Sequence, residues 1–232
     1  MSTPRNSRGI DLVIFDCDGV LVDSEVIACR AVAETLQAIG HRIAPETVAE
    51  RFAGMSNKDM YAQLERDLGA LPADFDAEMN RRAVAIFARE LKAMAGVEAV
   101  LAGLTVRACV ASSSTPTMLA RKLEWTGLAR WFVGGAFSTA AVARGKPAPD
   151  IFLYVAERLG VVPARALVIE DSLPGVTAAK AAGMTVFGFA GGSHCRPGHG
   201  ERLATAGAER VFAEMSALPP LIAQRNATFT TS

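Results

Sequence analysis

Short apolar segments alternate with helix-like segments along much of this chain, and no other feature constrains its fold as strongly. A proline stands at or just before the start of helical segments and a glycine follows them, as at 116–125 and 150–159. Apolar strand-like runs cover residues 12–15, 106–111, 166–169, 185–189 and 210–212. Short apolar strands separated by helices predict an α/β fold with a doubly wound parallel sheet and helices on both faces.

Residues 23–95 follow a different pattern, because they contain no strand-like run. Val32, Leu36 and Ile39 share one face of a first helix, and further helices are expected from Pro45, from Ser56 and within 72–94. We therefore predict two parts. Residues 1–22 and 96–232 form the α/β core, and residues 23–95 form an all-helical cap domain inserted after the first strand.

Two carboxylates stand at the end of the first strand. Asp16 and Asp18 directly follow the apolar run 12–15, and Gly19 comes next. Side chains two residues apart leave a strand on the same face. Ligands of open α/β sheets bind at the carboxyl ends of the strands. The pair therefore predicts a reaction site, although a D-x-D-G run alone is also typical of calcium loops and tight turns.

Later strand ends offer groups that suit a phosphate ester and a hard cation. The carboxylates of Glu170 and Asp171, with the two above, suit Mg²⁺, which prefers oxygen ligands. The hydroxyl of Ser112 and the ammonium of Lys146 suit phosphoryl oxygens. An aspartate beside Mg²⁺ can act as a nucleophile, and a second carboxylate can protonate a leaving oxygen. These groups indicate phosphoryl transfer.

These four segments, in this order, resemble the four motifs of the haloacid dehalogenase superfamily, in its phosphatase branch with a helical cap. The resemblance covers about residues 10–225 and implies a Rossmann-like core, with Mg²⁺ as cofactor. It also implies that Asp16 is the nucleophile and that Asp18 is the general acid and base. The residues that it implies for phosphate binding are Ser112, Ser113 and Lys146. The metal ligands that it implies are Asp16, Asp18 (through its backbone carbonyl), Glu170 and Asp171, with Glu170 either a ligand itself or a residue that contacts the ligands.

Within that family, the residues favour hydrolysis of a phosphate ester. Dehalogenases lack the second acid, which this chain has as Asp18. β-Phosphoglucomutases carry a histidine twelve residues after the nucleophile, where this chain has Ala28, and Asn57 stands where they have a basic cap residue. We expect a phosphatase for a sugar, sugar-acid or polyol phosphate. A phosphomutase and a non-catalytic binding protein of the same fold remain alternatives.

Several other polar residues allow both a functional and a structural interpretation. Candidate substrate-facing residues are Glu25, Arg51 and Asn57, although Asp23 to Glu25 also fit a helix start and charged helix residues often face solvent. Ser113 to Thr115 also fit helix caps. His194, Cys195 and His199 suggest a soft-metal site, but their loop setting and the missing fourth ligand favour an ordinary loop.

The composition limits the partners that we expect. The 24 basic and 24 acidic residues cancel, which disfavours binding to nucleic acid or to an anionic membrane. Four scattered cysteines, a polar start and the absence of a long apolar run favour a cytoplasmic protein without a signal peptide or membrane span. The expected partner is a small-molecule phosphate ester, and the expected state is a monomer or small homo-oligomer.

Overall fold

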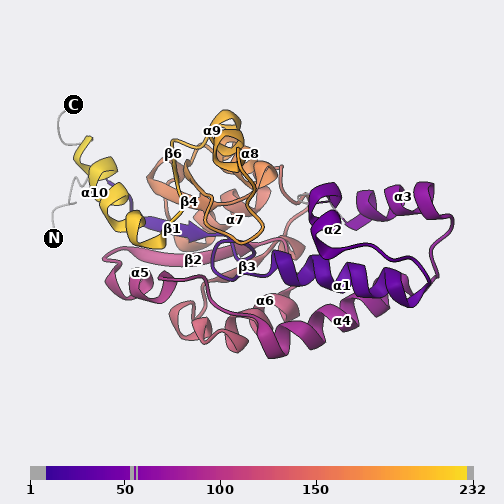
Figure 1. The fold of residues 1–232 in the computed structure, drawn as a ribbon. Coiled ribbons are helices and arrows are strands. Elements are labelled where there is room, and N and C mark those ends of the chain that lie inside the picture. Colours follow the sequence, from indigo (N-terminus) through magenta and orange to yellow (C-terminus); the bar gives the residue numbers. More distant parts are fainter. Residues whose placement is uncertain (1–8, 53–54, 56, 229–232) are drawn as a thin grey trace.

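A six-stranded parallel sheet forms the centre of the molecule (Figure 1). The structure is a computed structural model that describes residues 9–52, 55 and 57–228. In spatial order the strands are β3 (Ala136–Ser138), β2 (Arg107–Ser112), β1 (Leu12–Phe15), β4 (Ala166–Glu170), β5 (Thr185–Phe189) and β6 (Arg210–Phe212). Every neighbouring pair is parallel. The predicted fold class is confirmed.

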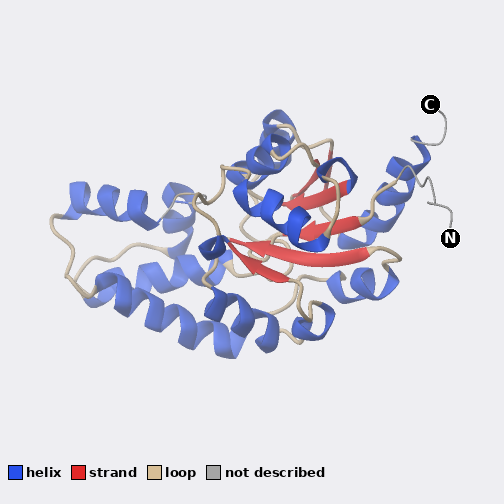
Figure 2. Cartoon of the chain, turned by 180° about the vertical axis from the view of Figure 1, so that it is seen from behind, coloured by secondary structure: helices blue, strands red, loops and turns tan. Residues whose placement is uncertain are grey.

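Helices cover both faces of this sheet, as Figure 2 shows. Leu12 and Ile14 of β1 belong to one buried cluster, and Val13 and Phe15 to the other, because successive side chains of a strand point to opposite faces. The first cluster includes residues of α7 (Asp150–Leu159), α8 (Leu173–Ala181) and α9 (His199–Ala206). The second includes residues of α5 (Val97–Gly103), α6 (Pro116–Trp125) and α10 (Leu218–Thr228). This burial on both faces explains why the strands are continuously apolar.

Four further helices lie beyond the carboxyl ends of the strands (Figures 1 and 2). They are α1 (Glu25–Ala38), α2 (Pro45–Phe52), α3 (Asn57–Leu68) and α4 (Phe75–Glu90). These helices pack around a cluster of their own, which contains Val32, Leu36, Val48, Met60 and Leu64. Their apolar positions repeat at the helical spacing that the sequence predicts. The carboxyl edge of the sheet therefore faces a helical layer.

Some elements differ from the prediction. Strand β3 was not predicted, because its three residues, Ala136–Ser138, include only one large apolar side chain. Helix α9 was not predicted either, since the glycines and proline before it are typical of a loop, and His199 is its first residue. The predicted helix start at Ser56 lies outside the described residues. Across the described ranges, every helix is too short or too polar to cross a bilayer.

Candidate active site

Three acidic side chains meet at the carboxyl edge of the sheet, where β1 lies beside β4. Asp16 follows β1, and its amide donates a hydrogen bond to the Ile169 carbonyl at 2.9 Å. Glu170 ends β4 and Asp171 follows it. All three are buried, and each offers an oxygen within 4.8 Å of the others. The carboxyl ends of adjacent strands therefore bring together acids that are far apart in the sequence, as the motifs predicted.

Lys146 lies among these acids with 5% of its side chain exposed. Its Nζ donates to Asp16 Oδ1 at 2.6 Å, to Glu170 Oε1 at 2.5 Å and to the Ala111 carbonyl at 3.0 Å. Burial alone would lower the pKa of Lys146, but Asp16 and Glu170 outweigh it and raise that pKa. Lys146 is therefore held as a charged ammonium at the point where the sequence predicts a phosphate.

Asp16, Glu170 and Asp171, which we call the acidic group, carry more negative charge than the single ammonium of Lys146 can compensate. Burial raises the pKa of Asp16 well above its ordinary value; Lys146 opposes this effect, and the charges of Glu170 and Asp171 add to it. A bound cation would offset the excess charge and keep Asp16 ionised. Because all three groups are carboxylates, the donor set fits Mg²⁺.

Two glycines allow the chain to approach these acids closely. A Cβ on Gly175 would lie 1.9 Å from Glu170 Oε1, so the start of α8 can pack against this carboxylate only with glycine there. Gly19 has a φ of +75°, and its Cβ would lie 1.9 Å from Asp171 Oδ2. The turn after Asp18 therefore depends on glycine both for its backbone conformation and for space.

Asp18 is held by a separate set of donors. Its Oδ1 accepts hydrogen bonds from Ser24 Oγ at 2.5 Å and from Lys122 Nζ, and its Oδ2 accepts one from Ser114 Oγ at 2.9 Å. Burial alone would raise the pKa of Asp18, but the ammonium of Lys122 and these hydrogen bonds outweigh burial and lower it. Without a bound ligand, Asp18 is therefore an ionised carboxylate.

Lys122 is the main site residue that the sequence does not reveal. It is 6% exposed on α6, its Nζ also donates to Ser114 Oγ at 3.0 Å, and the Phe87 ring of α4 lies 5.0 Å from Nζ. A buried lysine of this kind needs a charged partner. Its position in a helix of mixed polarity carries no sign of that partner, because Asp18 lies 104 residues earlier.

Of the hydroxyls that fit helix caps, one makes a cap hydrogen bond and two bond to Asp18 instead. Thr115 caps α6, since its side chain accepts a hydrogen bond from the Met118 amide at 3.3 Å. Ser114 instead donates to Asp18. Ser24 stands at the N-cap position before α1, but its hydroxyl also donates to Asp18 and makes no cap hydrogen bond.

We predict that Lys122→Met lowers kcat/KM for alkyl phosphates by about 10- to 100-fold, because Asp18 loses its charged partner and its fixed position. The loss should be smaller for aryl phosphates, whose leaving oxygen needs less help from a proton. Lys122→Arg keeps the charge and should retain most of the activity. Steady-state kinetics on both ester types measures these effects. Equal losses for Met and Arg on both esters would contradict this role of Lys122.

The other predicted site residues lie in varied settings. Ser112 is fully buried, and its Oγ accepts a hydrogen bond from the Ser114 amide at 3.0 Å, whereas Ser113 is exposed. Arg51 forms an ion pair with Asp67 of α3, and Asn57 is exposed at the start of α3. Among the interactions described, neither Arg51 nor Asn57 bonds to the acids of the sheet edge.

Glu25, at the start of α1, is half-buried near the acids. Burial, with the negative charges of Asp18 and Asp171, raises its pKa to about 7. Glu25 therefore gains a negative charge as the pH rises through neutrality.

We predict that this charge repels an anionic substrate, so that KM rises between about pH 6 and pH 8. Glu25→Gln should remove that rise. Since the folded-state pKa exceeds the ordinary value, ionisation of Glu25 costs stability as the pH rises from about 4.5 to about 7. The unfolding temperature of Glu25→Gln should therefore exceed that of the parent chain by more at pH 8 than at pH 5. The same KM profile in the variant and the parent chain would exclude this role.

The soft donors His194, Cys195 and His199 lie beside Asp171. His194 Nε2 is 3.1 Å from Asp171 Oδ2, and His199 Nε2 is 2.7 Å from the Asp171 carbonyl oxygen. Burial lowers the pKa of His194, but the hydrogen bonds with Asp171 and Cys195 outweigh it and raise the pKa to about 10. The interpretation of this segment as an ordinary loop is therefore incomplete, because it contacts the acidic group directly.

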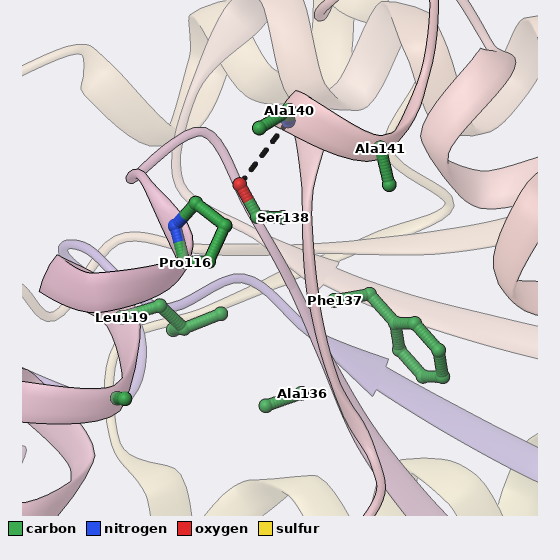
Figure 3. Close-up of a pocket in the computed structure, with 8 residues that line it drawn as sticks. Pro116, Leu119, Ala136, Phe137, Ser138, Ala140 and Ala141 are labelled. Carbon is green, nitrogen blue, oxygen red and sulfur yellow. Dashed lines mark hydrogen bonds between the residues drawn. The ribbon is translucent and has the colours of Figure 1, made fainter.

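A separate hollow lies at the sheet edge formed by β3 (Figure 3). Its lining comprises Pro116, Leu119 and Ala120 of α6 with Ala136, Phe137, Ser138, Ala140 and Ala141. The Ser138 hydroxyl accepts a hydrogen bond from the Ala140 amide at 3.1 Å and donates one to the Ser114 carbonyl at 2.6 Å. This hollow contains no charged side chain, so it does not compete with the acidic group as a candidate site.

Known proteins resemble this chain over most of its length. The profile of the haloacid dehalogenase-like hydrolases matches residues 10–183. The 6-phosphogluconate phosphatase of Escherichia coli (strain K12) is 31% identical over 91% of this chain and 94% of that protein. A haloacid dehalogenase-like protein of Agrobacterium tumefaciens is 42% identical, with a TM-score of 0.86 over 93% of this chain and 99% of its own. A hydrolase of Deinococcus radiodurans R1, solved with phosphate and sodium, is 31% identical, with a TM-score of 0.80 over 93% and 96%.

Proposed function

Because the chain belongs to the haloacid dehalogenase-like hydrolases, we propose that it is a Mg²⁺-dependent phosphatase for a small phosphorylated metabolite. The substrate class is a sugar, sugar-acid or polyol phosphate. One observation carries the proposal: Asp16, Glu170, Asp171 and Lys146 converge at one edge of the sheet, with Asp18 next to them. The relative named for 6-phosphogluconate and the relative with bound phosphate support this substrate class.

In the first step, Asp16 is the nucleophile. Its carboxylate attacks phosphorus, the bond between phosphorus and the ester oxygen breaks, and Asp18 gives a proton to the departing oxygen. Asp18 takes up that proton when the substrate binds, because a phosphate dianion beside it raises its pKa. Lys146, 2.6 Å from Asp16 Oδ1, neutralises charge on the transferred phosphoryl group. Ser112, with Ser113, is the proposed hydroxyl partner of the phosphate.

In the second step, water releases the phosphate. Asp18 accepts a proton from a water molecule, which attacks the phosphorus of the aspartyl-phosphate and frees Asp16. Mg²⁺, held by Asp16, Asp171 and the Asp18 carbonyl, would supply positive charge beside the phosphate oxygens. We place Glu170 behind these ligands, because its Oε1 accepts from Lys146 and its Oε2 from Ser172.

We further propose that residues 23–95 are a cap domain on a core formed by 1–22 and 96–232. In support, α1 to α4 have their own apolar cluster and lie over the carboxyl edge of the sheet. Closure of such a cap excludes water during the reaction. Glu25, Arg51 and Asn57 are its proposed substrate-facing residues. The four free cysteines fit a cytoplasmic location.

Release of inorganic phosphate from a panel of esters tests this function. The panel contains sugar, sugar-acid and polyol phosphates and p-nitrophenyl phosphate, each with and without Mg²⁺. We expect Mg²⁺-dependent release, fastest from one class of metabolite. Interconversion of hexose phosphate isomers without release would instead identify a mutase. No reaction with any ester would contradict an enzymatic function.

A further inference from the structure

We infer that His194, Cys195, His199 and Asp171 form a second metal site, selective for a borderline-soft cation such as Zn²⁺, and that its occupation antagonises Mg²⁺. The zinc site itself follows from the geometry of these four residues. Only the antagonism rests on the proposed function, because it assumes that Asp171 binds Mg²⁺.

The two donor distances around His194 are close to those of a tetrahedral zinc site. His194 Nε2 is 3.6 Å from Cys195 Sγ and 3.1 Å from Asp171 Oδ2. A tetrahedral zinc ion with ordinary bond lengths separates nitrogen from sulfur by about 3.6 Å and nitrogen from oxygen by about 3.4 Å. The donors of His194, Cys195 and His199 lie within 4.8 Å of one another. Asp171 Oδ2 lies against His194 Nε2, and we assign this carboxylate as the fourth ligand, which the three residues lack in the sequence.

Packing fixes the central ligand in place. The His194 side chain is 10% exposed. Its ring lies close to two glycines. A Cβ atom added to Gly192 would lie 2.6 Å from His194 Cε1, and one added to Gly19 would lie 2.9 Å from the same atom. In the described part of the chain, His194 Nδ1 is buried without a hydrogen-bond partner, so the polar contacts of the ring are made through Nε2. The ligand atom is thus held toward Asp171 and Cys195 before any metal binds.

The two donor sets select different cations. Thiolate and imidazole suit Zn²⁺, whereas the carboxylates of Asp16, Glu170 and Asp171 suit Mg²⁺. Asp171 belongs to both sets. A carboxylate oxygen engaged by zinc is withdrawn from Mg²⁺, and the two divalent ions repel each other at short range. By thermodynamic reciprocity, Mg²⁺ should weaken zinc binding by the same factor.

Direct binding of Zn²⁺ to the Mg²⁺-free full-length protein tests the site. Calorimetry should show one zinc ion per chain, with an affinity at least about tenfold lower in Cys195→Ser and in His199→Gln. Cys29→Ser, which removes another half-buried thiol, should bind as the parent does. With Co²⁺ as the probe, a thiolate-to-cobalt absorption band should appear in the parent and in Cys29→Ser but not in Cys195→Ser. Equal zinc affinity in Cys195→Ser and the parent would overturn the site.

Mg²⁺ titration of p-nitrophenyl phosphate hydrolysis tests the antagonism. A fixed concentration of Zn²⁺ should raise the half-saturating Mg²⁺ concentration about tenfold in the parent and in Cys29→Ser. The increase should be much smaller in Cys195→Ser. An equal increase in all three would show that zinc competes at the carboxylates alone, and would overturn the antagonism through Cys195. If no ester is hydrolysed, the proposed function fails, while the binding experiment still decides the zinc site.

Discussion

The Asp16→Asn variant is expected to lose at least about 10⁴-fold in kcat for phosphate release, because an amide cannot form the covalent bond to phosphorus. The change is nearly isosteric. The raised pKa of Asp16 means that its negative charge is disfavoured among Glu170 and Asp171, so a neutral side chain removes an unfavourable charge. Lys146 loses one partner but keeps Glu170 and the Ala111 carbonyl.

Two measurements check this prediction. Steady-state phosphate release gives the loss of activity, and thermal unfolding should give a midpoint at or above that of the parent chain. Asp23→Asn is a matched control, because Asp23 bonds to Ser193 outside the acidic group. Activity of Asp16→Asn within about tenfold of the parent would exclude Asp16 as the nucleophile.

The Asp18→Asn variant should lose about 10²- to 10⁴-fold with alkyl phosphates, the usual contribution of a general acid and base. An alkoxide leaves poorly without a proton, whereas an activated aryl oxide needs little assistance. The loss in the first step should therefore shrink as the leaving group becomes more acidic. Ser24 and Lys122, which donate to Oδ1 of Asp18, would still hold the amide oxygen in place.

A series of esters with leaving groups of graded acidity measures this effect. We expect kcat/KM of the variant to depend much more steeply on leaving-group acidity than that of the parent chain. Asp23→Asn serves again as the control and should show the slope of the parent. The same slope for Asp18→Asn and the parent would mean that Asp18 does not protonate the leaving oxygen.

The sequence predicts the positions of the candidate catalytic acids because local pattern determines them. Asp16 and Asp18 follow a buried strand, as do Glu170 and Asp171, and parallel strands carry such residues to one edge. This inference needs only the pattern of residues that are close together in the sequence. The structure also confirms the helices of 23–95 that lie in the described residues, whose apolar positions repeat at a helical period.

The sequence cannot predict the groups that surround these acids. Lys122 of α6 reaches Asp18 in the turn after β1, 104 residues earlier, and this tertiary contact has no local signature. The link between His194 and Asp171 is similar: a loop after β5 returns to the end of β4, so the fourth donor lies outside the local spacing of the three soft ligands. Such contacts depend on tertiary structure and not on periodicity.

The stereochemistry of phosphoryl transfer distinguishes an aspartyl-phosphate intermediate from direct attack by water. The substrate is a thiophosphate ester that carries two different oxygen isotopes on phosphorus, hydrolysed by the parent chain with Mg²⁺ in water of the third isotope, so that the released thiophosphate is chiral. Two successive in-line displacements, first by Asp16 and then by water, invert the phosphorus twice, so we expect net retention of configuration. Net inversion would mean a single displacement by water and would contradict the aspartyl-phosphate at Asp16.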